Sequence, residues 1–265
     1  MSRKRSSYED DTSLVTRKRT RANKSPEQKI IKDKFMEERI MAIKPIVAKT
    51  ENQKKYLDSL QKNTLTVGRG SAGVGKSYLA ASVASNKYLK GEIHKIILSR
   101  PIVQMGRSTG YWPGGIEEKI SPYLQPTLNT IKKIIGAARY ESEFGKTILI
   151  QPMESIRGMS FEAGTFLLVD EVQNMTPEEI RSVVTRTEEG AFIAFCGDDK
   201  QKDIQGVSGI VYLADIIKKH NLPNCGVVEF TSDDIVRSGL TKHFVKIFEE
   251  EGSVNNVERS YKEGK

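Results

Sequence analysis

The chain has 265 residues, with 42 lysines and arginines against 34 acidic residues and a formal net charge of +8. This length suits one α/β domain with tails, and no apolar run is long enough to cross a bilayer, so we expect no membrane-spanning segment. Residues 1–24 hold no apolar stretch of the secretory type, and the two cysteines, Cys196 and Cys225, are too far apart in sequence for a metal signature. These features favour a cytoplasmic, reducing location, and the basic balance suits a polyanionic partner such as nucleic acid.

Residues 1–25 are polar and basic, with two clusters of arginine and lysine. So little apolar surface cannot offset the entropy of ordering a chain, and we expect a disordered basic arm. The arm can contact nucleic-acid phosphates or serve as a solubilising tail, and its composition leaves both alternatives open. A Ser-Pro pair at residues 25–26 is typical of a helix start and opens the domain that we expect over residues 26–250, before a flexible tail at residues 251–265.

The most specific motif follows residues 63–68, a short β-branched stretch that predicts a strand. The motif is a complete G-x-x-x-x-G-K-[ST] phosphate-binding loop, formed by Gly70, Ser71, Ala72, Gly73, Val74, Gly75, Lys76 and Ser77. Its glycines let backbone N–H groups point into one hollow, Lys76 places positive charge against the β- and γ-phosphates, and the Ser77 hydroxyl can ligate Mg²⁺. A helix over residues 78–88 adds its N-terminus to this anion site, with Tyr78 among the expected nucleotide-binding residues. A glycine-rich connecting turn is the alternative, but it has no need for a Lys-Ser pair at this spacing.

Apolar stretches alternate with helical patterns along the rest of the chain. Strands are expected over residues 95–99, 147–151, 165–169, 191–196 and 227–230, with helices such as 176–187 and 210–220 between them. Continuous apolar strands separated by helices are typical of a mainly parallel sheet covered on both faces. The fold class that we predict is therefore α/β, of the P-loop NTPase type.

The apolar strand at residues 165–169 ends in two acids, Asp170 and Glu171. Two carboxylates at the mouth of a buried strand are costly without a cation, and a Mg²⁺ ion held by phosphates explains Asp170. Glu171 comes next and can orient or deprotonate an attacking water. The alternative is that both acids cap the following turn, which the phosphate loop upstream makes less attractive.

Two further strands end in polar residues at the same expected edge of the sheet. Asp198 and Gln201 follow residues 191–196, so Gln201 can hold the attacking water or detect the terminal phosphate, although a polar surface turn is the alternative. Arg100 follows residues 95–99 and can face a nucleic-acid backbone or a phosphate. Its alternative is an ordinary surface ion pair.

Three more residues are candidates from their surroundings. Arg237 follows the last strand and can neutralise charge as the γ-phosphoryl group leaves, within one subunit or across a subunit boundary. As for Arg100, an ordinary surface ion pair is the alternative. Tyr111 and Trp112 are adjacent on a Gly/Pro-rich loop and can stack on bases or pin the loop to the core.

Together these segments resemble the PhoH family of P-loop ATPases. The motifs that carry the resemblance are the phosphate loop, Arg100-Pro101, residues 113–119, residues 121–124, Asp-Glu-Val-Gln-Asn-Met-Thr-Pro at residues 170–177, Gly197-Asp198 with Gln201, and residues 234–237. Departures include Val172, where the family commonly has Ala, and Ser238-Gly239-Leu240 after Arg237, where it often has His-Pro-Leu.

The family core is similar to the first motor domain of superfamily-one helicases, and this similarity implies roles. Gln53 matches the residue that often contacts adenine, Gln201 the γ-phosphate sensor, and Arg237 the late arginine of the core. The resemblance implies ATP and Mg²⁺ as cofactors, a link to RNA rather than DNA, and a homo-oligomer, with a hexameric ring as one arrangement. We therefore expect a Mg²⁺-dependent ATPase that acts on or with nucleic acid; a nucleotide-dependent assembly or adaptor protein without unwinding activity is the alternative.

Overall fold

Six parallel strands form one sheet in the part of the chain that the computed structural model describes, which is residues 43, 45–102, 116–236 and 239–251. The strands are β1 (Leu65–Gly70), β2 (Lys95–Ser99), β3 (Ile148–Ile150), β4 (Thr165–Val169), β5 (Phe192–Gly197) and β6 (Cys225–Phe230). Their order across the sheet is β3-β2-β4-β5-β1-β6, and every neighbouring pair is parallel. All six carboxyl ends therefore lie at one edge, which is where open α/β sheets bind ligands.

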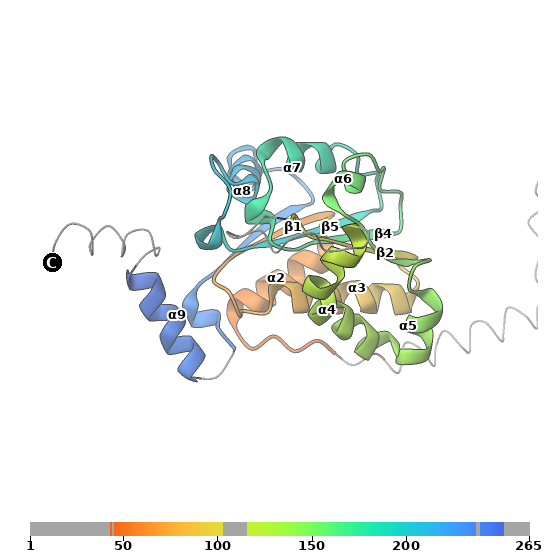
Figure 1. Ribbon diagram of the computed structural model, residues 1–265, viewed down its shortest axis with the longest axis horizontal. Coiled ribbons are helices and arrows are strands. Elements are labelled where there is room, and N and C mark those ends of the chain that lie inside the picture. Colours follow the sequence, from red (N-terminus) through yellow and green to blue (C-terminus); the bar gives the residue numbers. More distant parts are fainter. Residues whose placement is uncertain (1–42, 44, 103–115, 237–238, 252–265) are drawn as a thin grey trace, which may run out of the picture. The chain divides into compact units, whose positions relative to one another are not determined.

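Helices cover both faces of this sheet (Figure 1). One face carries α2 (Glu51–Lys62), α3 (Lys76–Lys90), α4 (Ile116–Ile135) and α5 (Ala137–Glu143), and the other carries α6 (Met153–Ile156), α7 (Pro177–Val184) and α8 (Gly209–His220). The other described elements are the short 3₁₀ helices η1 (Val172–Asn174), η2 (Asp199–Gln201) and η3 (Ser232–Asp234), and the last helix α9 (Gly239–Glu251).

Strand β4 shows why the sheet needs cover on both sides. Phe166 and Leu168 pack into the core formed with α3, whereas Leu167 and Val169 pack into the core formed with α7. All four side chains are buried, and a strand that is apolar at every position can only be stable with both of its faces covered. The predicted fold class, α/β with a parallel sheet and helices on both faces, is confirmed.

Several predicted boundaries differ from the observed ones by two or three residues, around the phosphate loop, at the start of β6 and at the end of α7. β2 and β4 have the bounds expected from the sequence, whereas β1 begins and ends two residues later than expected, because Gly70 still pairs with Phe230 of β6. Helix α3 is longer than expected at both ends. It runs between Gly75 and Gly91, whose φ angles of 87° and 75° lie in the left-handed region, so glycine sets both ends.

Strand β5 lies between β1, which leads into the phosphate loop, and β4, which leads into the two acids. The loop after β5 therefore emerges between the loop after β1 and the loop after β4. This order brings three chain segments that are far apart in the sequence to one stretch of the sheet edge.

Some predictions fall outside the described residues. These are the basic arm at residues 1–25, the helix start at residues 25–26 and the tail predicted at residues 251–265, of which only Glu251 is described, as the last residue of α9. Among the residues that the structure does describe, no helix has both the length and the apolar character needed to cross a membrane.

Candidate functional site

The phosphate loop joins β1 to α3 at the carboxyl edge of the sheet. Gly70 has a φ of 115°, and a Cβ atom there would lie 2.0 Å from the carbonyl oxygen of Phe230, so only glycine fits. Gly73 and Gly75 also have positive φ angles, of 79° and 87°. The loop therefore has the curled backbone that its sequence predicts, and the N-terminal N–H groups of α3 open beside it, as in anion sites at helix N-termini.

Lys76 is held against the loop itself. Its ammonium group donates to the carbonyl oxygens of Gly70 (2.6 Å) and Ser71 (2.8 Å), and the side chain is only 9% exposed. Burial lowers the pKa of Lys76, and the nearby carboxylate of Asp198 acts in the opposite direction. A cation that is this deeply buried gains from additional negative charge beside it, and phosphate groups would supply that charge.

Asp170 and Ser77 form the part of the site that fits a metal ion. Burial raises the pKa of Asp170, and a hydrogen bond from the Ser77 hydroxyl acts in the opposite direction. A half-buried carboxylate beside a hydroxyl offers the hard oxygen ligands that Mg²⁺ prefers. In the part of the chain that is described, no cluster of three or more His, Cys, Asp or Glu side chains could hold a metal. The two oxygens would thus need water and phosphate oxygens to complete an octahedral shell.

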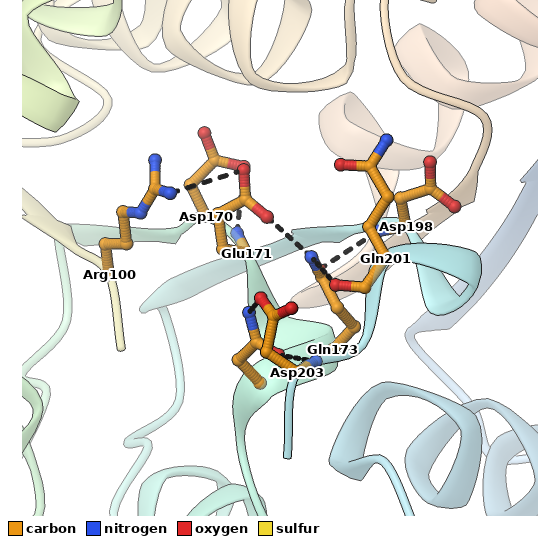
Figure 2. A network of polar contacts seen from close by, with 8 residues as sticks. Arg100, Asp170, Glu171, Gln173, Asp198, Gln201 and Asp203 are labelled. Atoms are coloured by element: carbon orange, nitrogen blue, oxygen red, sulfur yellow. Dashed lines mark hydrogen bonds and ion pairs between the residues drawn. The ribbon is translucent and has the colours of Figure 1, made fainter. Parts of the chain in front are cut away.

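Glu171 has an unusual backbone and a carboxylate engaged on both sides (Figure 2). Its φ and ψ of 56° and 35° place a non-glycine residue in the left-handed region, and its N–H donates to Oδ1 of Asp170 (3.0 Å). Its Oε2 accepts from Nε2 of Gln173 (2.5 Å), and its Oε1 lies 3.7 Å from a guanidinium nitrogen of Arg100. Left-handed non-glycine residues are uncommon and cluster at functional sites.

Gln173 joins the loop after β4 to the loop after β5, a role that the motif at residues 170–177 does not reveal. Its side chain is fully buried, and its Oε1 accepts from the N–H of Asp198 (3.0 Å) while its Nε2 also donates to the carbonyl of Gln201 (3.3 Å). Figure 2 shows this amide between Glu171 on one side and Gln201 on the other. The available signal was a pair of amide residues, Gln173 and Asn174, between the apolar Val172 and Met175 shortly after the two acids.

Gln201 lies in η2. The loop that carries it is hydrogen-bonded to η1 through Gln173 and also through Asn174. Asp198 is buried, and its Oδ1 accepts from the N–H of Lys200 (3.1 Å). Asn174 accepts from the N–H of Asp203 (2.8 Å) and donates to its carboxylate (3.3 Å). The polar residues after β5 therefore form a largely exposed turn whose backbone is bonded to η1.

One cavity of about 450 Å³ brings these residues together. It is lined by most of the phosphate loop, by both acids and by Gln201, and its lining includes Lys76, Ser77, Arg100, Tyr123, Asp170, Glu171 and Gln201. The sequence predicts that Arg100 faces a phosphate or a nucleic-acid backbone, with an ion pair as the alternative; in the structure it lines this cavity and pairs with Glu171. Its guanidinium also lies over the ring of Tyr123 from α4, at 4.9 Å. Tyr123 belongs to the motif at residues 121–124, but the sequence did not predict this contact.

A second cavity, of about 850 Å³, adjoins the first at Gly75 and Tyr78, which line both. Gln53 lines it as well, with a partner at each end of its amide: Nε2 donates to the carbonyl of Val74 (2.9 Å), and Oε1 accepts from the N–H of Lys49 (2.7 Å). Tyr78 is 57% exposed at the junction. Apolar side chains such as Ile46 contribute to the lining, as a flat heterocyclic ring would require.

Three predicted site residues lie outside the described residues, so their roles stay predictions. They are Tyr111, Trp112 and Arg237.

The phosphate loop, the Ser77–Asp170 pair and Glu171 at one edge of a parallel sheet define a P-loop NTPase domain. Residues 45–249 match the family described as PhoH-like protein, and the chain belongs to that family. It is 33% identical to the PhoH-like protein of Bacillus subtilis (strain 168) over 211 residues, 78% of this chain and 65% of that one. It is also 33% identical to Protein PhoH of Escherichia coli (strain K12) over 203 residues, 74% of this chain and 56% of that one. The chain thus spans less than two thirds of the length of these relatives.

Solved structures with a similar arrangement are more distant. The UvsW helicase from bacteriophage T4 has a TM-score of 0.46 and 11% identity, covering 75% of this chain and 67% of that one. The large terminase of a thermophilic bacteriophage, solved in complex with ADP, has a TM-score of 0.45 and 14% identity, covering 73% of this chain and 48% of that one.

Proposed function

We propose that this chain is a Mg²⁺-dependent ATPase that acts on or with nucleic acid, with RNA favoured over DNA. The observation that supports it most is the single cavity shared by the phosphate loop, Asp170, Glu171 and Gln201, which arrive from the ends of three different strands. Nothing in packing alone requires two acids, a buried lysine and a hydroxyl to meet at one hollow, whereas phosphoryl transfer does.

Each residue has a distinct task in this proposal. The loop amides and Lys76 bind the β- and γ-phosphates, and Ser77 and Asp170 hold the metal ion. Mg²⁺, when bound, neutralises charge on the phosphate oxygens. Glu171 accepts the proton of the attacking water, and Gln201 orients that water against the γ-phosphate.

The second cavity suits the adenosine part of the nucleotide. It continues from the first cavity past Gly75 and Tyr78, with the exposed Tyr78 ring at the junction. Gln53 already bonds Val74 and Lys49, so in this proposal its amide rearranges, or holds the segment that borders the base, when adenine binds.

The nucleic-acid part of the proposal rests on charge and on family membership. The net charge of +8 attracts a polyanion, and the basic arm at residues 1–25 would contribute phosphate contacts. Arg237 would act in its own subunit or in a neighbour within a homo-oligomeric ring, and the expected location is the cytoplasm.

A second candidate, a nucleotide-dependent assembly protein without unwinding activity, is favoured by α9. Leu240, Phe244 and Ile247 of this helix are 69%, 50% and 48% exposed, at helical spacings of four and three residues. An apolar stripe of this kind suits contact with another protein surface.

The test compares the wild-type protein with K76A and E171Q. We expect K76A to lose nucleotide binding in calorimetry, and E171Q to bind ATP but lose hydrolysis. Rates measured with no polymer, with single-stranded RNA and with single-stranded DNA, across salt concentrations, separate the two candidates. Stimulation that weakens steeply with salt supports action on nucleic acid, whereas ATP-dependent assembly without stimulation by either polymer supports the second candidate. Wild-type ATPase activity in E171Q would contradict the role of Glu171.

A further inference from the structure

We propose that Arg100 is a positioning residue that orients the carboxylate of Glu171 for its reaction with water, rather than a residue that binds nucleic acid. This inference rests on the proposed ATPase activity and adds a residue to its machinery.

The backbone fixes Arg100 next to the two acids. Arg100 directly follows β2, whose last residue Ser99 is paired in register with Val169 at the end of β4. The N–H of Asp170 then donates to the carbonyl of Ser99 at 3.0 Å, which continues the pairing by one step. The same backbone hydrogen bonds therefore fix the Cα positions of Arg100 and of the two acids.

The carboxylate of Glu171 has one partner on each oxygen (Figure 2). Gln173 donates to Oε2 at 2.5 Å, and the Arg100 guanidinium lies 3.7 Å from Oε1 on the other side. Two partners on opposite oxygens resist rotation of the carboxyl group, which a single partner would permit. The torsion at the end of a glutamate side chain is otherwise broad, so orientation has to come from such contacts.

Arg100 is itself held in place. Its guanidinium lies over the ring of Tyr123 at 4.9 Å, and its side chain is 24% exposed against 31% for Glu171. A partly exposed ion pair at 3.7 Å contributes little to the free energy of folding. Fold stability therefore does not account for this contact between Arg100 and Glu171. A guanidinium that lies between an aromatic ring and a carboxylate inside the phosphate cavity is also poorly placed for a polymer that passes over the surface.

This geometry predicts which kinetic constant changes. Loss of the guanidinium leaves Glu171 held from one side, so the base is misaligned in the transition state, while the phosphate loop and the Ser77–Asp170 pair are untouched. The rate of the chemical step then falls and ATP affinity does not.

The experiment compares wild type, R100Q and R100K. For each protein it measures kcat, the KM for ATP and the calorimetric affinity for a non-hydrolysable ATP analogue. It also measures the affinity for single-stranded RNA over a range of salt concentrations. R139Q is the matched control, because Arg139 lies over the ring of Tyr88 at 4.8 Å and does not line the cavity, so it has a similar aromatic contact without a catalytic neighbour. We expect kcat to fall about 10- to 100-fold in R100Q, with KM and analogue affinity within about threefold of wild type, and kcat to fall less in R100K. R139Q should match wild type. The double variant R100Q/E171Q should be no slower than E171Q alone, measured by single turnover, because Arg100 acts through Glu171.

Three results would overturn the inference. Normal kcat in R100Q with weaker RNA binding, and a salt slope reduced by about one, would make Arg100 a nucleic-acid contact. A higher KM with unchanged kcat would make it a ground-state phosphate contact. A kcat in R139Q as low as in R100Q would mean that the loss of activity follows from removing any such arginine and not from the contact between Arg100 and Glu171. If the wild-type protein itself neither binds nor hydrolyses ATP, the proposed function fails and takes this inference with it, whereas an active wild type with a normal R100Q refutes only the inference.

Discussion

Replacing Gln173 with alanine tests the central contact of the site. The substitution removes the acceptor for the buried N–H of Asp198 and the donor to Glu171 and to the carbonyl of Gln201. An unsatisfied buried N–H costs about 1–3 kcal/mol. The bond to Glu171 adds roughly 1 kcal/mol, discounted because that carboxylate is 31% exposed and regains water. We expect the free energy of unfolding to fall by about 2–4 kcal/mol, or a melting temperature lower by roughly 5–15 °C.

Denaturant unfolding and kcat together give the assay. Q173A should lose both stability and at least about tenfold in kcat, because Glu171 loses one of its two partners. N174A is the matched control: the side chain of Asn174 accepts from the N–H of Asp203 at 2.8 Å, whereas its bond to Glu171 runs from its backbone N–H to the Glu171 carbonyl (3.0 Å), which the substitution keeps. We expect N174A to lose about 1–2 kcal/mol with kcat within about threefold of wild type.

The charged variant Q173E sharpens the test. It keeps an oxygen for the N–H of Asp198 but places a second carboxyl group opposite Glu171, where two ionised groups cannot coexist at hydrogen-bond distance. The folded state of Q173E then keeps a proton on the carboxyl pair at pH values where the unfolded chain, with ordinary glutamate pKa values, has released it. The free energy of unfolding should therefore be highest at acid pH and fall as pH rises. A Q173A protein within about 0.5 kcal/mol of wild type, with normal kcat, would refute the reasoning.

Three further predictions concern other parts of the site and its support. Burial raises the pKa of Asp170 in the folded protein, so ionised Asp170 destabilises the fold above its folded-state pKa and has no such effect below its unfolded-state pKa. D170N should therefore be about 0.5–2 kcal/mol more stable than wild type at neutral pH and lose that gain near pH 3, as denaturation at both pH values would check. Rate measurements should show that D170N has lost Mg²⁺-dependent hydrolysis. Cys196 is fully buried, and burial is the main cause that raises its pKa to about 12. A thiol reagent at pH 8 should therefore label Cys196 only after unfolding, whereas the half-buried Cys225 should react in the native protein. Rapid labelling of both thiols in the native protein would contradict this prediction. G70A should lose ATP binding in calorimetry and at least about 2 kcal/mol of stability, because its Cβ would lie 2.0 Å from the carbonyl of Phe230 at a φ of 115°.

Much of the fold follows from residues that are close together in the chain. The five apolar residues of β4 are buried at every position, as an uninterrupted apolar run predicts for a central parallel strand. Helix α7 begins at Pro177 after Thr176, whose hydroxyl accepts from the N–H of Glu179 while the Glu179 carboxylate bonds the N–H of Thr176. Both partners of this capping box are three residues apart, so the sequence displays it directly.

The order of the strands does not follow from the sequence in the same way. Alternating strands and helices predict a parallel sheet, but they do not say that β5 lies between β1 and β4. That order depends on how the two cores are filled across the whole chain, and it decides which loops meet. The sequence analysis could therefore name Asp170, Glu171 and Gln201 as candidates without giving the contacts between them.

The residues that were missed act through distant contacts. Tyr123 is 23 positions from Arg100 and lies in the middle of a helix, where an aromatic residue is usually interpreted as packing. Gln173 is 28 positions from Gln201, the carbonyl that it bonds. No local pattern distinguishes a residue whose partner is set by tertiary structure.

One pair shows how such a contact constrains the sequence at both ends. A Cβ atom on Gly197 would lie 2.7 Å from Oε1 of Gln173, so the glycine that ends β5 makes room for the amide that follows the acids. Oε1 and Nε2 of that amide bond the loop after β5, and Nε2 also holds Glu171. Since Gln173 is fully buried and bonds both groups, we expect a displacement of the Gln201 backbone to act on the Glu171 carboxylate. If Gln201 responds to the γ-phosphate, the base is therefore coupled to that response by three hydrogen bonds within one buried amide. G197A should weaken the coupling even with every titratable residue of the site intact, so single-turnover hydrolysis should slow while calorimetric ATP affinity stays the same. A G197A protein that hydrolyses ATP at the wild-type single-turnover rate would show that this amide does not carry the coupling.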